Sequence, residues 1–463
     1  MKTVLLIDDD HDFRKALDEW LSSEGWRVME AENGEAGWDL IRAERPDVVI
    51  CDLLMPRCNG FRLCRLVHQD PELAAIKIII SSSRGYAGDR TNAIDAGADE
   101  YLVKPVDHAR LTKLLERLLA PPAAAAPQPA PLPAPVLPAN PPEPLSHAEQ
   151  SGLDGQPALV RFWGVRGSLP TPGPKTVFYG GNTTCVEVRA DNQIIILDAG
   201  TGIRPLGLSM VQEFKDRPIN ATILITHTHW DHIQGFPYFV PVYNPKNHIT
   251  ICGFEGAREG LQTILSAQME SPYFPVSLRQ LPSHISIREL HDLKFNIGKV
   301  QVEASFANHP GICVGYRLNT SGGSIVFLPD NEPHQRLRGQ SAEKLTPEAV
   351  AYARQQDERL IEFIRDADVL IIDSQYDDTE YQSHVGWGHG CLDDVVTLAL
   401  FAGVKQLHLF HHDPDHDDAQ ITHMVNWARD LVTLHGDSLV VEAAREGVEV
   451  VLKPVTELVQ QAD

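Results

Sequence analysis

Two kinds of hydrophobic spacing alternate along the first 119 residues. Four short apolar runs have the length of buried strands, and they lie at Val4–Ile7, Val48–Ile50, Ile76–Ile80 and Tyr101–Val103. Between these runs, apolar residues recur every three or four positions, which is the spacing of amphipathic helices. Strands that alternate with helices predict a parallel sheet with helices on both faces. The pattern therefore predicts an α/β domain of the doubly wound type.

Polar residues follow the predicted strands of this domain. Asp8 and Asp9 follow the run Val4–Ile7, and Asp52 follows Val48–Ile50. Ser82 follows Ile76–Ile80, and Lys104 follows Tyr101–Val103; these runs are the first, third, fourth and fifth strands of the domain. The C-terminal ends of parallel strands meet at one edge of a sheet, so we expect these side chains to converge. Clustered carboxylates repel one another unless a cation joins them, and Mg²⁺ prefers oxygen ligands. A nearby lysine can neutralise an added phosphoryl group, and a serine hydroxyl can hydrogen-bond to it.

The whole segment 1–119 resembles the receiver domain of bacterial response regulators. The resemblance implies a (βα)5 fold in which Asp52 is the phospho-acceptor, Asp8 and Asp9 hold Mg²⁺, and Lys104 contacts the phosphoryl group. It also implies a cognate sensor histidine kinase as partner. A flavodoxin-like fold with acidic loops, and a receiver that has lost its chemistry, are the alternatives.

Two further receiver roles follow from the same resemblance. Ser82 takes the position of the switch hydroxyl, and Tyr101 that of the aromatic side chain that changes rotamer with it. Ser81 or Ser83 would be the switch residue if the predicted strand ended one residue earlier or later.

Residues 120–157 have a different composition from the rest of the chain. From Pro121 to Pro144 most residues are proline or alanine, which favours extended polyproline-type conformers. A linker of about 35 residues at ~3.1 Å each could span up to ~100 Å. We therefore expect regulation to act through docking, dimerisation or localisation, and not through rigid transmission between domains.

In the second predicted domain, residues 158–463, the densest group of candidate ligands follows the apolar run Ile223–Ile225. The next seven residues read Thr-His-Thr-His-Trp-Asp-His. Side chains two apart in an extended backbone point the same way, so His227 and His229 can share one metal. After the turn, Asp231 and His232 can face a second metal. Imidazole and carboxylate ligands suit zinc, manganese or iron; a merely histidine-rich polar loop is the alternative.

Three more candidate ligands stand at the ends of predicted strands. They are His309, Asp330 after Ile325–Leu328, and His411 after Leu407–Phe410. We expect two sets that share one bridging carboxylate: His227, His229, His309 and Asp330 for the first metal, and Asp231, His232, Asp330 and His411 for the second. His408 and His412 compete with His411 for the last position. Such a site keeps open positions for a bridging water or hydroxide.

The second domain resembles the metallo-β-lactamase superfamily, an αββα sandwich, and its H-x-H-x-D-H motif carries the resemblance. Four stretches resemble the phosphodiesterase branch, which includes ribonuclease Z and the cyclic-nucleotide phosphodiesterases: Phe162–Ser168, Gly180–Cys185, Gly386–Gly390 and His411–Pro414. The resemblance implies that Asp231 and His389 are catalytic, with His389 as a general acid or phosphate contact. Here Gly390 replaces the usual serine, and Val385 stands where lysine is common.

An insertion at residues 252–290 predicts a helix that begins near Leu261. Tyr273 and Phe274 follow it. These aromatic side chains could stack on a substrate ring, or the insertion could simply pack on the sandwich.

Composition narrows the choice of partners and compartment. Forty basic and 63 acidic residues among 463 give a net charge of −23, which repels polyanions, so we expect neither DNA nor large RNA as a ligand. A small anionic substrate held by metals is compatible with this charge. Seven scattered cysteines without a C-x-x-C pair favour a reducing, cytoplasmic location. Neither a signal peptide nor a membrane span is expected.

These observations lead to one main hypothesis. The protein is a two-component response regulator whose output is a binuclear metal-dependent phosphodiesterase, acting on a small phosphodiester that is possibly a cyclic nucleotide, and controlled by phosphorylation of Asp52. Alternatives are a thioesterase or lactonase with the same metals, a di-iron oxidoreductase, and a non-catalytic signalling scaffold. Zinc is the expected metal, with manganese or iron as alternatives, and a homodimer is left open.

Overall fold

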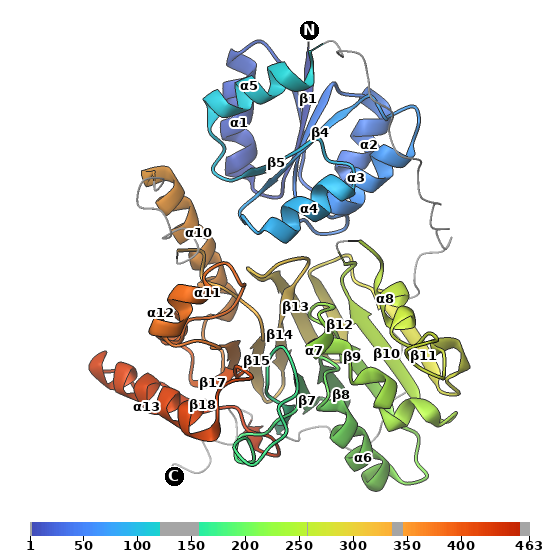
Figure 1. Ribbon diagram of the computed structural model, residues 1–463, viewed down its shortest axis with the longest axis vertical. Helices are drawn as coiled ribbons and strands as arrows, with labels where there is room; N and C mark the ends of the chain where they lie inside the picture. Colours follow the sequence, from blue (N-terminus) through green and yellow to red (C-terminus); the bar gives the residue numbers. More distant parts are fainter. Residues whose placement is uncertain (1, 121–156, 257, 336–345, 454–463) are drawn as a thin grey trace. The chain divides into compact units, whose positions relative to one another are not determined.

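The computed structural model describes residues 2–120, 157–256, 258–335 and 346–453 (Figure 1). Its contacts divide the chain into two compact units, each described by itself. The predicted linker lies almost entirely outside the described residues. Within the described ranges, no helix is both long and apolar enough to cross a membrane.

The first unit is a five-stranded sheet with strand order β2-β1-β3-β4-β5. All neighbouring strands are parallel. The strands are β1 Thr3–Ile7, β2 Arg27–Ala31, β3 Val48–Asp52, β4 Lys77–Ser82 and β5 Glu100–Val103. The helices are α1 His11–Ser23, α2 Gly34–Glu44, α3 Gly60–Gln69, α4 Ala87–Asp95 and α5 His108–Leu118. Helices α1 and α5 cover one face and α2, α3 and α4 the other, which confirms the predicted (βα)5 fold (Figure 1).

The strands that were visible as apolar runs are the ones covered on both faces. All five residues of β3 are buried, as expected for a central strand of a parallel sheet. Strand β2 lies at the edge of the sheet, and only Ala31 is buried in it. Its polar sequence is why hydrophobic spacing alone did not mark it.

The second unit packs two seven-stranded sheets against each other. The first sheet has the order β11-β10-β9-β8-β7-β6-β19, and the second β12-β13-β14-β15-β16-β17-β18. The first comprises β6 Ala158–Gly164, β7 Cys185–Ala190, β8 Gln193–Leu197, β9 Asn220–Leu224, β10 His248–Gly253, β11 His284–Glu289 and β19 Glu449–Leu452. The second comprises β12 Lys294–Ile297, β13 Val300–Phe306, β14 Val314–Thr320, β15 Gly323–Leu328, β16 Val369–Asp373, β17 Gln406–Phe410 and β18 Val440–Ala443. Phe162 and Leu224 from the first sheet meet Phe327 and Phe410 from the second in one apolar core.

Helices cover the outer faces of both sheets. The first sheet carries α6 Ile203–Phe214, α7 Trp230–Ile233 and α8 Leu261–Ala267, with short 3-10 helices η1 Phe236–Tyr238, η2 Val240–Tyr243 and η3 Leu278–Gln280. The second carries α10 Pro347–Ile364, α12 Leu392–Phe401 and α13 Asp418–Leu434, and α11 Asp378–His384 lies in a connecting segment. The order helix, sheet, sheet, helix confirms the predicted αββα sandwich (Figure 1).

The insertion forms the predicted helix, α8. Phe274 packs against the apolar cluster on the outer face of the first sheet and meets the Tyr238 ring edge to face, with centroids 5.5 Å apart. Tyr273 is exposed. Phe274 therefore packs on the sandwich, which was the second of the two alternatives for the aromatic side chains of the insertion.

Candidate metal centre and receiver site

The seven candidate ligands of the second unit lie on loops that leave strand ends. The loop after β9 carries His227 and His229, and the short helix α7 that follows it carries Asp231 and His232. The loops after β13, β15 and β17 carry His309, Asp330 and His411. The structure brings all seven side chains into one cluster, although they span positions 227 to 411 of the sequence.

One half of the cluster contains three imidazoles near one carboxylate oxygen. The His309 Nε2 atom lies 3.0 Å from His229 Nδ1. Asp330 Oδ2 is 3.8 Å from His227 Nε2 and 3.6 Å from His309 Nε2. Two nitrogen ligands of a tetrahedral zinc ion are about 3.3 Å apart, given Zn–N bonds of about 2.0–2.1 Å. The spacing of these side chains is therefore that of ligands around a single cation.

The other half is arranged around the second oxygen of the same carboxylate. Asp330 Oδ1 lies 3.1 Å from His232 Nε2 and 3.5 Å from His411 Nε2. Asp231 Oδ2 lies 3.2 Å from His232 Nε2 and 3.1 Å from His411 Nε2. The two oxygens of Asp330 thus face different imidazoles, and the division of the ligands between two metals stays a prediction.

Unsatisfied polar atoms test whether this cluster suits a metal. His227 Nε2, His232 Nε2 and Asp330 Oδ1 are buried and make no hydrogen bond. Buried polar atoms without a partner are costly, and native proteins contain few of them. Here all three point into the space shared by the candidate ligands. The donor set therefore fits two divalent cations.

In three of the five imidazoles the outer nitrogen donates to an acceptor. His232 Nδ1 donates to Asp198 at 2.8 Å, His309 Nδ1 to the carbonyl of Gly388 at 2.8 Å, and His411 Nδ1 to the side-chain oxygen of Gln375 at 3.1 Å. A proton on Nδ1 leaves Nε2 with its lone pair directed into the cluster. Such outer hydrogen bonds orient the histidine ligands of metal sites.

The electrostatics differ between the members of the metal-free cluster. Burial holds the pKa of His227 and of His309 well below the usual value, so both rings are neutral, as metal ligands must be. Burial would raise the pKa of Asp330, but the imidazoles around it, His411 foremost, hold it well below its usual value. For His411 burial acts to lower the pKa, and the carboxylates of Asp330 and Asp231 outweigh it, raising the pKa to about 9.

His389 lies beside the cluster on the loop before α12. Its Nδ1 atom is 2.9 Å from Asp373 Oδ2 and 3.8 Å from Asp330 Oδ2. Its ring stacks on that of His411, with centroids 4.9 Å apart and an angle of 20° between the planes. The predicted catalytic histidine is thus held against the candidate metal ligands.

Several supporting residues were not found by sequence reasoning. They are Asp198, Glu332, Asp373 and Gln375, and all four are buried. Asp198 and Asp373 each stand at the end of a strand, which is a usable signal. Glu332 offered none, because its carboxylate accepts from the backbone N–H groups of residues 386 and 388, far along the sequence.

The two competitors of His411 point elsewhere. His408 lies within β17, is buried, and has its ring 5.3 Å from that of Phe162. His412 Nε2 donates to the carbonyl of Ala444 at 3.0 Å. This placement favours His411 as the last ligand.

In the receiver, the lysine joins the carboxylates at the sheet edge. Lys104 Nζ lies 2.6 Å from Asp8 Oδ2 and 2.7 Å from Asp52 Oδ1. All three side chains are buried, whereas Asp9 is exposed. Burial and the charge of Asp52 raise the pKa of Asp8 to about 7. An oxygen-only set with this repulsion fits Mg²⁺.

The predicted switch residues lie next to this site. Strand β4 extends to Ser82, two residues beyond the predicted run, and the Ser82 hydroxyl accepts from the N–H of Arg84 at 3.2 Å. The Ser81 hydroxyl instead donates to the carbonyl of Cys51 at 3.5 Å. Tyr101 is buried and donates its hydroxyl hydrogen bond to the carbonyl of Arg84 at 2.9 Å. This arrangement favours Ser82 over Ser81 and places Tyr101 in an inward rotamer.

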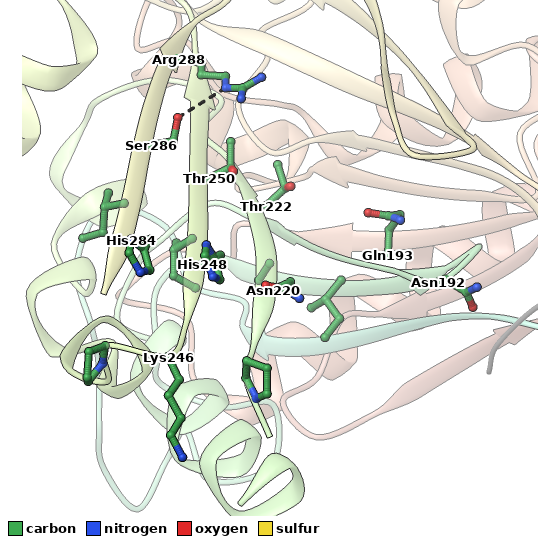
Figure 2. Close-up of a pocket in the computed structure, with 16 residues that line it drawn as sticks. Asn192, Gln193, Asn220, Thr222, Lys246, His248, Thr250, His284, Ser286 and Arg288 are labelled. Atoms are coloured by element: carbon green, nitrogen blue, oxygen red, sulfur yellow. Dashed lines mark hydrogen bonds between the residues drawn. The ribbon is translucent and has the colours of Figure 1, made fainter. Parts of the chain in front are cut away.

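A hollow of 830 Å³ in the second unit lies over β9, β10 and β11 (Figure 2). Thr222, Thr250 and Ser286 form a polar row across the three strands. Two residues further along β9 and β10, Leu224 and Cys252 belong to the apolar core between the sheets. The same sheet face thus changes from covered and apolar to open and polar, and none of the candidate ligands lines the hollow.

Comparisons with known proteins agree with this two-part architecture. A family model described as "Response regulator receiver domain" matches residues 4–116, and one described as "Beta-lactamase superfamily domain" matches residues 193–412. Protein PilH of Pseudomonas aeruginosa is 38% identical over 120 residues, which cover 26% of this chain and 99% of PilH. Transcriptional regulatory protein AfsQ1 of Streptomyces coelicolor is 37% identical over 121 residues, and the chain spans about half of it, 52%.

Among solved structures, the metallo-beta-lactamase fold protein YhfI of Bacillus subtilis is 15% identical, with a TM-score of 0.44. The match covers 64% of this chain and 99% of YhfI. The receiver match extends over nearly all of PilH and over the sheet that carries Asp8, Asp52 and Lys104. The chain therefore belongs to the response regulators, and its receiver domain is followed by a domain of the beta-lactamase superfamily.

Proposed function

We propose that this response regulator has an enzymatic output, a binuclear metal-dependent phosphodiesterase. The observation that carries the proposal is the division of the cluster about Asp330. One of its oxygens faces His227 and His309, and the other faces His232 and His411. Buried ligand atoms that make no hydrogen bond occur on both sides, as expected if two cations would share this carboxylate.

The residues of the cluster have defined tasks in this reaction. His227, His229, His309 and Asp330 would hold one cation, and Asp231, His232, Asp330 and His411 would hold the other. When bound, two such cations lower the pKa of a shared water and stabilise negative charge on the phosphoryl oxygens. His229 is the exposed ligand, so we place the substrate entrance on its side.

His389 and Asp373 complete the proposed chemistry. The carboxylate of Asp373 accepts from His389 Nδ1 and also from the backbone N–H groups of Asn331 and Gln375, which fix its position. With Nδ1 occupied, His389 Nε2 is the atom that would donate a proton to the leaving oxygen. His389 is thus the proposed general acid, and Asp373 its positioning partner.

Regulation is proposed to act through Asp52. A sensor histidine kinase would phosphorylate this side chain, with Mg²⁺ held by Asp8 and Asp9 and the added charge met by Lys104. Residues 120–157 are the proposed linker to the hydrolase. We place the reaction in the cytoplasm, since none of the seven cysteines, all within the described residues, forms a disulfide, as in reducing compartments.

The substrate would be a small phosphodiester, and a direct assay tests the proposal. Protein reconstituted with Zn²⁺, Mn²⁺ or Fe²⁺ should hydrolyse bis-p-nitrophenyl phosphate, and Asp231→Ala should abolish hydrolysis. A screen of cyclic mono- and dinucleotides, with and without an acyl-phosphate mimic, would then identify the substrate and the sign of regulation. Hydrolysis of thioesters or lactones without any phosphodiester turnover would contradict the proposal.

A further inference from the structure

Two tryptophan side chains that the proposed chemistry does not use are exposed beside the metal cluster. Trp230 is 76% exposed and stands between His229 and Asp231. Trp387 is 60% exposed and stands two residues before His389. A single exposed tryptophan needs no explanation, but large apolar side chains gathered at one site indicate a binding surface.

Both tryptophans leave the chain close to the same imidazole. His229 Nδ1 lies 3.0 Å from His309 Nε2, and Trp230 follows His229. The carbonyl of Gly388 accepts from His309 Nδ1 at 2.8 Å, and Trp387 precedes Gly388. The two contacts are made at different nitrogens of the His309 ring. The indoles therefore originate on two sides of one candidate ligand.

The backbone that presents each indole is held in place. The buried carboxylate of Glu332 accepts from the N–H of Gly386 at 2.7 Å and from that of Gly388 at 2.9 Å, on either side of Trp387. The N–H of Trp387 itself donates to the carbonyl of His384 at 3.0 Å. Trp230 opens α7, where its carbonyl accepts from the N–H of residue 234 at 2.7 Å. Because little backbone freedom is left to lose, stacking on these rings costs little ordering entropy.

We propose that Trp230 and Trp387 form a clamp for a planar aromatic group carried by the phosphodiester, and that they determine substrate specificity. The inference rests on the proposed function, because it places the phosphoryl group at the metal cluster and the aromatic group between the indoles. Aromatic rings attract one another through stacked or edge-to-face contacts, and an indole offers the largest face among protein side chains. The clamp therefore selects esters that keep a ring next to the phosphorus.

Two substrates with the same leaving group test the clamp. Bis-p-nitrophenyl phosphate and methyl p-nitrophenyl phosphate both release p-nitrophenolate, and only the first keeps an aromatic ring on phosphorus. The ratio of their kcat/KM values, divided by the ratio of their uncatalysed rates, isolates the contribution of that ring. We expect Trp230→Leu and Trp387→Leu each to lower this corrected ratio by about 10-fold, the order of effect found when a stacking aromatic is removed.

Control variants distinguish loss of the clamp from a general loss of structure in the two Leu variants. Trp427 on α13 is 43% exposed, so Trp427→Leu removes an indole of comparable exposure away from the cluster and should leave the ratio unchanged. Trp230→Phe and Trp387→Phe keep a ring and should restore much of the preference. Metal content per chain should match wild type in every variant that is scored.

A binding measurement separates the clamp from catalysis. Phenylphosphonate and methylphosphonate differ only in the ring, and calorimetry on the metal-loaded full-length protein gives their affinities without turnover. Tighter binding of phenylphosphonate that disappears in the two Leu variants supports the clamp even if neither ester is hydrolysed, in which case the proposed function alone fails. Hydrolysis of both esters with an unchanged ratio in both variants overturns the clamp and leaves the proposed function standing. If the two Leu variants differed from wild type only in their oligomeric state, with the corrected ratio and the phosphonate affinities unchanged, the clamp would also be overturned.

Discussion

The receiver site and the metal cluster are built on the same plan, yet they compensate charge differently. In both, acidic residues gather where strands of a buried sheet end. In the receiver, the Lys104 ammonium touches Asp8 and Asp52, so the protein supplies a cation of its own. In the second domain, Asp330 and Asp231 are surrounded by imidazoles, and three buried atoms of the cluster, His227 Nε2, His232 Nε2 and Asp330 Oδ1, make no hydrogen bond.

This difference indicates which of the two sites, the receiver site or the metal cluster, depends on bound metal for its structure. A carboxylate pair that already contacts an ammonium group is partly neutralised before any ion binds. The imidazole cluster instead contains buried atoms whose unmet hydrogen-bonding capacity only an added group can satisfy. We therefore expect metal removal to disturb the second domain far more than the receiver.

The largest effect is expected from Asp330→Ala, because this side chain faces both halves of the cluster. Loss of the shared carboxylate should lower phosphodiesterase activity by about 1000-fold or more and reduce the bound metal per chain. Activity assays and elemental analysis of the purified protein measure both. Asp366, an exposed carboxylate, provides the control variant Asp366→Ala. Full metal content in Asp330→Ala would contradict the bridging role.

The substitution Asp52→Asn tests the receiver site. The variant should lose incorporation of phosphate from a small acyl-phosphate donor, because the phospho-acceptor oxygen is gone, while the unphosphorylated protein keeps its basal phosphodiesterase activity. Phosphate-affinity gel electrophoresis measures the first, and the p-nitrophenyl ester assay the second. Asp95→Asn, at an exposed position of α4, should be labelled normally. Labelling of Asp52→Asn at the wild-type level would show that another residue is the acceptor.

A smaller effect is expected from Asp198→Asn, which tests the outer support of the cluster. Asp198 accepts from His232 Nδ1, and its backbone has φ of +61°, a conformation that asparagine tolerates. The substitution keeps the shape and removes the charge. Metal affinity should fall by about 10- to 100-fold, as measured by competition with a chromophoric chelator. An unchanged affinity would mean that the hydrogen bond to His232 does not tune the site.

The smallest effect concerns stability and pH. Burial lowers the pKa of His408 to about 4, against about 6.5 in an unfolded chain. Below pH 6.5 the unfolded state therefore binds more protons than the folded state, and stability is lost as pH falls from about 6.5 towards 4. Between pH 7 and pH 5 the loss from this residue is about 2 kcal/mol. Chemical unfolding at both pH values should show a shallower dependence in His408→Leu; an equal slope would contradict this assignment.

Much of the fold could be predicted because burial imposes a readable pattern. The strands covered on both faces, such as β3, are continuous apolar runs, and the ligands directly follow such runs. Strand β2 escaped detection, since only one of its five residues is buried and the strand contains no continuous apolar run. Hydrophobic spacing reports how much of a segment is covered and not which neighbour covers it.

The supporting residues of the site were harder to predict for a related reason. Asp373 is the last residue of β16, and Gln375 follows that strand. Their side chains support the site because His389 and His411 lie beside them. Glu332 is 54 residues from Gly386, whose N–H it binds. Such pairings arise from the packing of distant loops. They leave no periodic signal in the chain.

The segment from Asp330 to Glu332 shows how tightly chain length is constrained here. Asp330 faces the metal cluster, Asn331 Oδ1 accepts from the N–H of Asn308 beside His309, and Glu332 holds the loop that carries Trp387. Three consecutive residues thus contact three different parts of the site: the metal cluster, the backbone beside His309 and the loop that carries Trp387. A single inserted or deleted residue would break all of these contacts together, whereas a substitution breaks one. In any redesign of this domain, new sequence can be tried at these positions one at a time, but the number of residues has to stay fixed.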